Sequence, residues 1–159
     1  MGKTLWDFSV ELYARPGVAD ACLRLQDDAG ADVCLLLAAL WLERRGVRAT
    51  AERVAQLERL AAPWQAAVTA PLRDLRRAWK VAAQDDAELA ALRRQLAALE
   101  LQAERLLLQR LAALSENWPP DAPGASDWLA GLSAPQRAGW SAAGRAALQR
   151  LRDAAAAQS

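Results

Sequence analysis

The sequence predicts an all-α protein, a compact bundle of about five to seven helices with one long helix near residues 85–114 and a C-terminal helical segment. Ala, Leu, Arg, Glu and Gln dominate the 159 residues, and these residue types favour helices. β-branched residues are scarce, and no stretch alternates apolar and polar side chains for long enough to indicate a strand. With 53% hydrophobic and 25% charged residues, the chain is expected to be globular.

Local signals divide the N-terminal region into three helices. Thr4 is expected to cap the first helix, which ends at Arg15 because the residue before Pro16 is disfavoured in helices. Pro16 is then expected as an early residue of the second helix. Gly30 suits a left-handed C-cap and Asp32 an N-cap, so a tight turn should lead into the third helix.

The third helix, Val33 to about Arg45, is apolar almost all round at its start, which places it at the centre of the core. Thr50 is expected to cap a fourth helix. Pro63 and Pro71 are expected to break up the following stretch, each beginning a helical turn.

Asp85-Asp86 is expected to begin the longest helix, which runs to about Leu114. Its apolar residues step by three and four, as in a heptad seam: Leu89, Leu92, Leu96, Leu99, Ala103 and Leu106. The seam is then expected to shift to Leu107, Leu111 and Leu114. So short a seam favours packing within the chain. A homodimer contact through residues 89–114 is the alternative.

A proline-rich linker over residues 117–127 separates a predicted helical core domain, residues 1–116, from a C-terminal helical segment, residues 128–159. Ser133 to Gln136 has the pattern of a capping box, so a helix is expected to open there and run to about Ala155, with Trp140 inward. Docking of this segment on its own core is favoured over docking on a partner.

Charge is unevenly distributed although the net charge is only +1. Residues 43–80 contain most of the excess positive charge, so an anion-binding surface would be expected there. Asp7 and Glu11 interrupt any N-terminal signal core, and the longest apolar run, Val33 to Leu42, is too short to span a bilayer. The sequence therefore predicts a cytoplasmic protein that does not interact with membranes.

The N-terminal two thirds of the chain resembles a small proteobacterial family of uncharacterised helical proteins, a domain of unknown function. The resemblance covers roughly residues 5–112 and is most specific at its start. It implies a helical bacterial protein and no particular activity. It rests on the residues Trp6-Asp7-Phe8-Ser9, Tyr13, Arg15-Pro16-Gly17-Val18, Cys22-Leu23, Leu25-Gln26-Asp27, Gly30, Asp32-Val33, Leu35-Leu36-Leu37, Trp41-Leu42, Trp64, Pro71-Leu72-Arg73, Arg77 and Trp79-Lys80.

Catalytic and metal-binding patterns are missing from the sequence. It contains no histidine, which excludes Ser-His-Asp and Cys-His mechanisms. Cys22 and Cys34 lie among apolar residues and are expected in the core, and two cysteines do not make a four-ligand zinc site. The acidic residues around Gly30 lack the spacing of a calcium loop. We therefore expect no cofactor, no metal and no enzymatic activity.

Two groups of residues are candidate binding sites. Arg73, Arg76, Arg77 and Lys80 form a basic stripe at helical spacing, suited to phosphate groups or an acidic partner, although a solvated face partly neutralised by nearby acids is the simpler interpretation. Seven tryptophans are many for this length. Most are expected in the core, and the candidates to line a groove are the aromatic residues Trp6, Tyr13, Trp41, Trp64 and Trp79.

These features favour a non-enzymatic adaptor or regulatory protein that acts through protein–protein contact. One alternative is a nucleic-acid- or ribosome-associated protein that uses Arg73–Lys80. A second alternative is a carrier of a small apolar ligand in a tryptophan-lined pocket.

Overall fold

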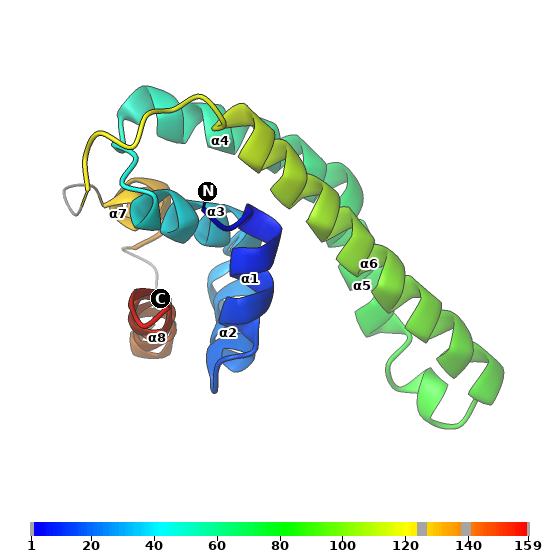
Figure 1. The fold of residues 1–159 in the computed structure, drawn as a ribbon. Coiled ribbons are helices and arrows are strands. Elements are labelled where there is room, and N and C mark those ends of the chain that lie inside the picture. Colours follow the sequence, from blue (N-terminus) through cyan, green and yellow to red (C-terminus); the bar gives the residue numbers. More distant parts are fainter. Residues whose placement is uncertain (1, 124–126, 138–140, 159) are drawn as a thin grey trace.

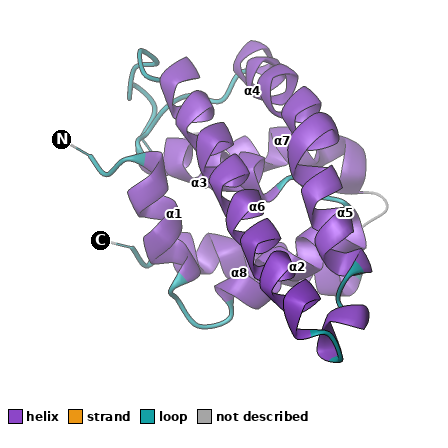
Figure 2. Cartoon of the chain, turned by 90° about the vertical axis from the view of Figure 1, so that its right-hand side faces the viewer, coloured by secondary structure: helices purple, strands orange, loops and turns teal. Residues whose placement is uncertain are grey.

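The computed structural model describes residues 2–123, 127–137 and 141–158, without the side chains of 28, 29 and 133–137. All regular elements of this part of the chain are helical (Figure 2), which confirms the predicted all-α bundle. Helices α1 to α4, α7 and α8 form a body, and a hairpin of α5 and α6 projects from it (Figure 1). No helix in the described part is long and apolar enough to span a membrane.

The first three helices begin and end largely as their local signals predict. α1 (Leu5–Tyr13) is capped by Thr4, whose hydroxyl accepts from the Asp7 N–H at 3.1 Å. α2 (Val18–Ala29) ends at Gly30 in the left-handed region, and Asp32 caps α3 (Val33–Arg44). The prediction for Pro16 is wrong, because Gly17, with φ +80°, is the N-cap and places Pro16 in the preceding turn.

The expected helix start at Pro63 is also wrong, whereas Pro71 lies at the start of a helix as expected, although no loop precedes it. α4 (Ala51–Trp64), a π-helical turn η1 (Gln65–Thr69) and α5 (Ala70–Ala78) follow one another without a loop. Pro63 lies inside α4, and Pro71 lies in the first turn of α5. The wider π turn between the two prolines shifts the hydrogen-bond register and so keeps the chain helical.

α6 (Ala87–Leu114) begins and ends where predicted, with Asp86 as its N-cap. A short 3-10 turn, η2 (Ala82–Gln84), joins it to α5, and these elements form the projecting hairpin (Figure 1). The predicted seam is correct only in part: Leu96 and Ala103 are buried, whereas Leu92, Leu99 and Leu106 are about half exposed. After the expected shift of the seam, Leu107 and Leu111 are buried as predicted and Leu114 is exposed.

The C-terminal segment contains two helices where the sequence predicted one opening at Ser133. α7 (Trp128–Arg137) already includes Ser133, so the capping-box prediction is wrong at the backbone level. α8 (Ala142–Ala156) has its own cap, Ser141. α7 packs against α3 and α4, and α8 against α2 and α3. Trp140 and the Ser133 and Gln136 side chains lie outside the described part.

The hydrophobic core surrounds α3, as its all-round apolar sequence predicts. Leu36 to Leu42 are all buried there. Trp128 of α7 is fully buried against this helix region, where its indole Nε1 donates to the Val47 carbonyl at 2.8 Å and its ring stacks on Trp118. The core therefore combines residues from both ends of the chain.

Candidate functional site

A cavity of about 310 Å³ lies where the α5–α6 hairpin joins the body. Its wall is mostly apolar and aromatic, with four longer polar side chains among the apolar ones. A volume of this size is at the lower end of the range for small-molecule sites. The lining comes from α1, α2, α3, η1, α5 and α6: Trp6, Ser9, Val10, Tyr13, Gln26, Val33, Cys34, Leu37, Gln65, Arg73, Leu101, Glu104 and Leu108.

Arg73 is the buried cation of this site. It projects from α5, is only 8% exposed, and lies 3.5 Å from a Glu100 oxygen and 3.9 Å from a Glu104 oxygen. Its guanidinium forms no hydrogen bond with any described residue, and its Nε is buried without a partner. Because a guanidinium has five N–H donors, Arg73 retains most of its capacity to bind an acceptor.

Glu100 is already engaged by a second arginine. The Nε of Arg76 donates to one Glu100 oxygen at 2.6 Å, and its Nη2 donates to the other at 3.4 Å. Such a two-point pairing is the strong form of an arginine–carboxylate contact. Glu100 therefore receives its hydrogen bonds from Arg76 and forms only a longer ion pair with Arg73.

Glu104 is the carboxylate that lines the cavity itself. Its nearest cation among the described residues is Arg73, at 3.9 Å, and no hydrogen bond between the two side chains is formed. Burial, with the neighbouring Glu100 charge, raises the pKa of Glu104 from 4.5 to about 7. At neutral pH this carboxyl group exists both with and without its proton, so it is suited to accept from or donate to a bound molecule.

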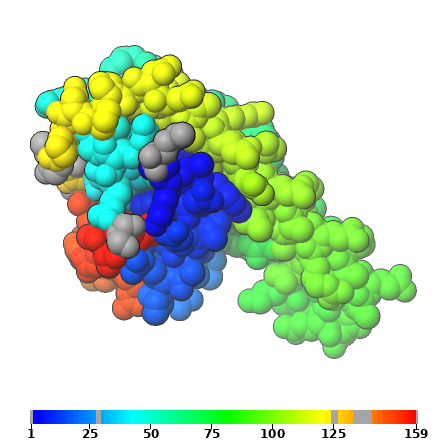
Figure 3. All heavy atoms as spheres, in the orientation of Figure 1, coloured from blue at the N-terminus to red at the C-terminus, as the bar shows by residue number. Residues whose placement is uncertain are grey.

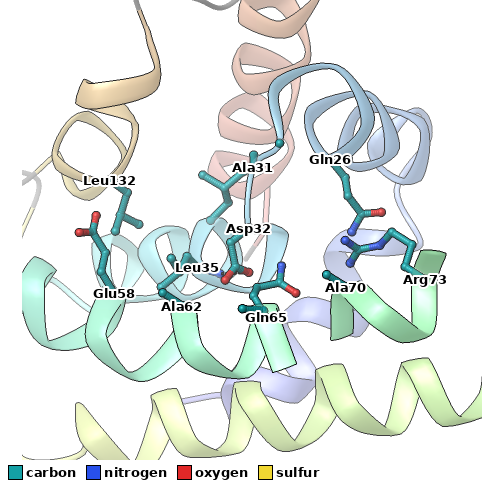
Figure 4. A pocket seen from close by; sticks show the side chains of 13 residues that line it. Gln26, Ala31, Asp32, Leu35, Glu58, Ala62, Gln65, Ala70, Arg73 and Leu132 are labelled. Atoms are coloured by element: carbon teal, nitrogen blue, oxygen red, sulfur yellow. Dashed lines mark hydrogen bonds between the residues drawn. The ribbon is translucent and has the colours of Figure 1, made fainter. Parts of the chain in front are cut away.

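A second cavity, of about 540 Å³, shares part of its polar lining with the smaller one (Figure 4). Gln26, Gln65 and Arg73 line both cavities. Asp32 lies beside Gln65, and Arg73 and Gln26 point toward one another (Figure 4). Asp32 Oδ2 and Gln65 Oε1 are buried without hydrogen-bond partners. Unmatched polar atoms from three elements therefore gather between the two cavities.

Asp32 has two roles in this arrangement. Its Oδ1 accepts from the Cys34 and Leu35 N–H groups at 3.0 and 3.3 Å, which caps α3 as the sequence predicts. Burial raises its pKa to about 6, although these hydrogen bonds and the charge of Arg73 oppose the rise. Sequence reasoning identified the cap but missed the polar group, because Gln65 and Arg73 are distant in the sequence.

The cysteines are buried and unpaired, as expected for core residues. Burial raises the pKa of Cys22 to about 11 and that of Cys34 well above its ordinary value. Burial also raises the pKa of Tyr13, whose side chain lies next to Cys22. All three groups are therefore protonated at neutral pH, and neither thiol has the ionised form that redox or metal chemistry needs.

The predicted aromatic groove is only partly assembled. Trp6 and Tyr13 line the smaller cavity. Trp41 and Trp64 do not line it, and their indole N–H groups donate to the Lys3 and Ala103 carbonyls, respectively. Trp79 is half-buried at the end of α5 and lines neither cavity.

The predicted basic stripe is divided between different environments. Arg73 and Arg76 face the acids of α6, and Arg77 pairs with Asp27 of α2. Lys80 is exposed. The four cations therefore do not form one exposed surface, and the acids of the long helix and Asp27 offset most of their charge.

The outer face of α6 carries an uncharged stripe that includes Leu92, Leu99 and Leu106 of the predicted seam, which sequence reasoning placed mainly inside the chain's own packing. Except for the half-buried Ala91, its members are exposed, and they extend for about 33 Å at the rise of an α-helix. Arg110 borders the stripe, but its guanidinium lies over the Trp64 ring. The stripe consists of Ala91, Leu92, Gln95, Ala98, Leu99, Gln102, Leu106, Gln109 and Ala113.

Comparison with known protein families gives a match over residues 4–111, to a family described as proteins of unknown function, DUF2390. The chain belongs to the DUF2390 family. This finding confirms the resemblance to an uncharacterised domain family. Neither the curated proteins nor the solved structures gave a match.

The DUF2390 match contains nearly all of the candidate site. Every residue that lines the smaller cavity falls within it, as does all of the lining of the larger cavity except Leu132. α7 and α8 follow the matched region. The polar group around Arg73 is therefore part of the family domain, whereas Trp128 and the helix α8 that covers α2 are not.

Proposed function

We propose that this DUF2390 protein is a non-enzymatic adaptor or regulatory protein that acts through protein–protein contact in the bacterial cytoplasm. The observation that carries the proposal is the uncharged stripe on α6. One quarter of the residues in this chain are charged, yet a helical face of about 33 Å between residues 91 and 113 carries only Leu, Ala and Gln. Such a face is suited to contact with another protein.

The spacing of the stripe supports an α-helix as the bound element. Leu92, Leu99 and Leu106 are separated by seven residues and are each about half exposed. Leucines at this spacing insert between the side chains of a second helix that has its own apolar residues at heptad positions. The alanines between them permit close approach of the two backbones. The partner is thus an amphipathic helix recognised mainly by its apolar face.

The shape of the molecule also supports contact through the hairpin. The end of the α5–α6 hairpin projects from the body and stands apart from α1, α2 and α8 (Figure 3). Val81 and Leu75 near this end are exposed, as is Leu92 of the stripe. A nucleic-acid role is less well supported, because Arg73 and Arg76 are directed toward Glu100 and not toward solvent.

Photo-crosslinking from the stripe tests the proposal. A photoreactive residue at Leu99 should give one recurring product with another protein in cells, with the crosslink in an amphipathic helix of that partner. Leu92→Ser together with Leu106→Ser should abolish this product. The matched control is a photoreactive residue at Arg94, which is exposed on the same helix but outside the stripe.

Two results would contradict the proposal. One is a set of products from position 99 no richer than that from position 94. The other is a product that contains only two copies of this chain, which would assign the stripe to a homodimer contact within residues 89–114.

A further inference from the structure

The smaller cavity carries an inference independent of the α6 stripe. It has an apolar end and a polar end. Trp6, Val10, Tyr13, Leu37, Leu101 and Leu108 line the apolar part, and Gln26, Gln65, Arg73 and Glu104 line the polar part. Such a division is typical of a site for a small molecule with an apolar body and a polar head.

The donors and acceptors at the polar end indicate the kind of head group. Arg73, more than nine-tenths buried, offers N–H donors that no described residue accepts. Glu104 and Gln65 offer acceptor oxygens, and the Gln65 Oε1 is buried without a donor. The site therefore needs a head group with an acceptor for Arg73 and donors for Glu104 and Gln65, because buried polar groups without partners are costly.

The charges around the site favour a head group that carries both signs. Arg73 and Glu104 line the cavity, Asp32 and Glu100 lie near Arg73, and Arg76 pairs with Glu100. An anionic head would meet the Glu104 carboxylate as well as Arg73. A cationic head would leave the Arg73 donors unmatched. A zwitterion adds no net charge and supplies both partners.

We propose that the cavity between α1, α3, α5 and α6 binds a small zwitterion of the α-amino acid type with an apolar side chain. The ligand carboxylate accepts from the Arg73 guanidinium, because a guanidinium matches a carboxylate in a two-point contact. The ligand ammonium donates to Glu104 and to the Gln65 oxygen. The apolar side chain lies among Leu37, Leu101 and Leu108, next to the Tyr13 ring.

Arg105 does not compete for this head group. Its guanidinium lies over the Trp6 ring, 4.7 Å from the ring centroid, and it does not line the cavity. Trp6 itself lines the cavity, so its indole reports on occupancy. Ligand entry should change the tryptophan fluorescence, and Trp6→Phe should remove most of that change.

Calorimetric titration of the full chain with three related probes tests the proposal. L-phenylalanine has both charged groups, phenethylamine lacks the carboxylate, and 3-phenylpropionate lacks the ammonium. We expect L-phenylalanine to bind at least about tenfold more tightly than either of the other two, since each loses one charged contact. L-alanine should bind more weakly than L-phenylalanine because it leaves the apolar end unfilled.

Conservative variants separate the site from general effects on folding. Glu104→Gln keeps the size of the side chain and should weaken L-phenylalanine binding at least about tenfold. Arg73→Lys keeps the charge but loses the two-point geometry, and it should reduce the preference for L-phenylalanine over phenethylamine. The matched control is Glu88→Gln, on the same helix but exposed and far from the cavity. Thermal melts of each variant verify that it is folded.

The proposal is overturned if none of the amino acids binds at millimolar concentration, which would leave the cavity to water. It is equally overturned if phenethylamine or 3-phenylpropionate binds as tightly as L-phenylalanine. Binding that Glu104→Gln and Arg73→Lys both leave unchanged would place the ligand elsewhere on the protein.

Discussion

Replacement of Trp128 by alanine should destabilise the whole protein and not only its C-terminal helices. The side chain is fully buried, stacks on Trp118 with ring centroids 5.8 Å apart, and donates from Nε1 to the Val47 carbonyl. Large-to-small replacement of a buried aromatic side chain costs about 3–5 kcal/mol in the free energy of unfolding. For a chain of this length, that loss lowers the melting temperature by roughly 6–20 °C.

Trp128→Phe separates the hydrogen bond from the packing. Phenylalanine retains most of the apolar contact but leaves the Val47 carbonyl without its donor, which costs about 1–3 kcal/mol. Urea unfolding followed by circular dichroism measures both variants, and the dependence on denaturant reports whether the transition still includes the whole molecule.

Trp79→Ala is the matched control, because Trp79 is half-buried at the end of α5, away from the core. A loss below about 1 kcal/mol for Trp128→Ala, no larger than that for the control, would refute the reasoning, since a docked but dispensable segment would behave in this way. An unchanged midpoint with a lower dependence on denaturant would show that α7 and α8 detach before the body unfolds.

Three further predictions concern charge and backbone geometry. The folded state raises the Glu104 pKa from 4.5 to about 7, so the free energy of unfolding should be highest below pH 4.5 and should decrease as the pH rises to about 7. In urea titrations, Glu104→Gln should flatten this decrease, whereas Glu88→Gln should not. Arg76→Ala leaves Glu100 buried without its two-point partner and should lower the free energy of unfolding by about 3 kcal/mol. Arg77→Ala, whose partner Asp27 is more exposed, should lower it by less than about 1 kcal/mol in the same assay. Equal losses would contradict the assigned pairing. Gly46→Ala should destabilise the protein more than Gly30→Ala. Both glycines have positive φ, but only at Gly46 would the added Cβ meet backbone, the Pro123 Cα at 3.2 Å. A smaller loss of stability at Gly46 would show that the linker moves aside.

Features governed by neighbouring residues were predictable from the sequence. The caps Thr4, Asp32, Thr50 and Asp86 each accept from an N–H two or three positions along the chain, so the signal and its effect lie in the same short segment. The left-handed glycine after α2 is local in the same sense. These signals were sufficient to locate most helix ends.

Features governed by distant residues were not predictable in this way. The start of α7 is stabilised by Glu43 of α3, whose carboxylate accepts from the Trp128 N–H at 2.8 Å, as well as by the local Asp127, which accepts from the Ala130 N–H at 3.0 Å and which sequence reasoning overlooked in favour of Ser133. Leu92 and Leu96 both fit the heptad pattern of α6, and only the packing of the body determines which one is covered. The burial of Arg73 likewise depends on Glu100 and Glu104 across the hairpin.

The polar group between the two cavities shows the same limit. Its members come from α2, α3, η1, α5 and α6, and each has an ordinary local explanation in the sequence. Arg73 fits a surface stripe, Asp32 a cap and Gln65 a polar position between prolines. Their shared burial is a property of the tertiary fold, which a single sequence without its three-dimensional contacts does not contain.

The unbroken length of α6 has a mechanical consequence. Leu108 and Glu104 line the cavity at the base of this helix, and Ala87 lies at its far end, about 30 Å away at the rise of an α-helix. A stiff rod pivoting by about 5° at its base moves its end by roughly 2.6 Å over that length. A small tilt of α6 at the cavity would therefore displace its N-terminal end by about the size of a side chain.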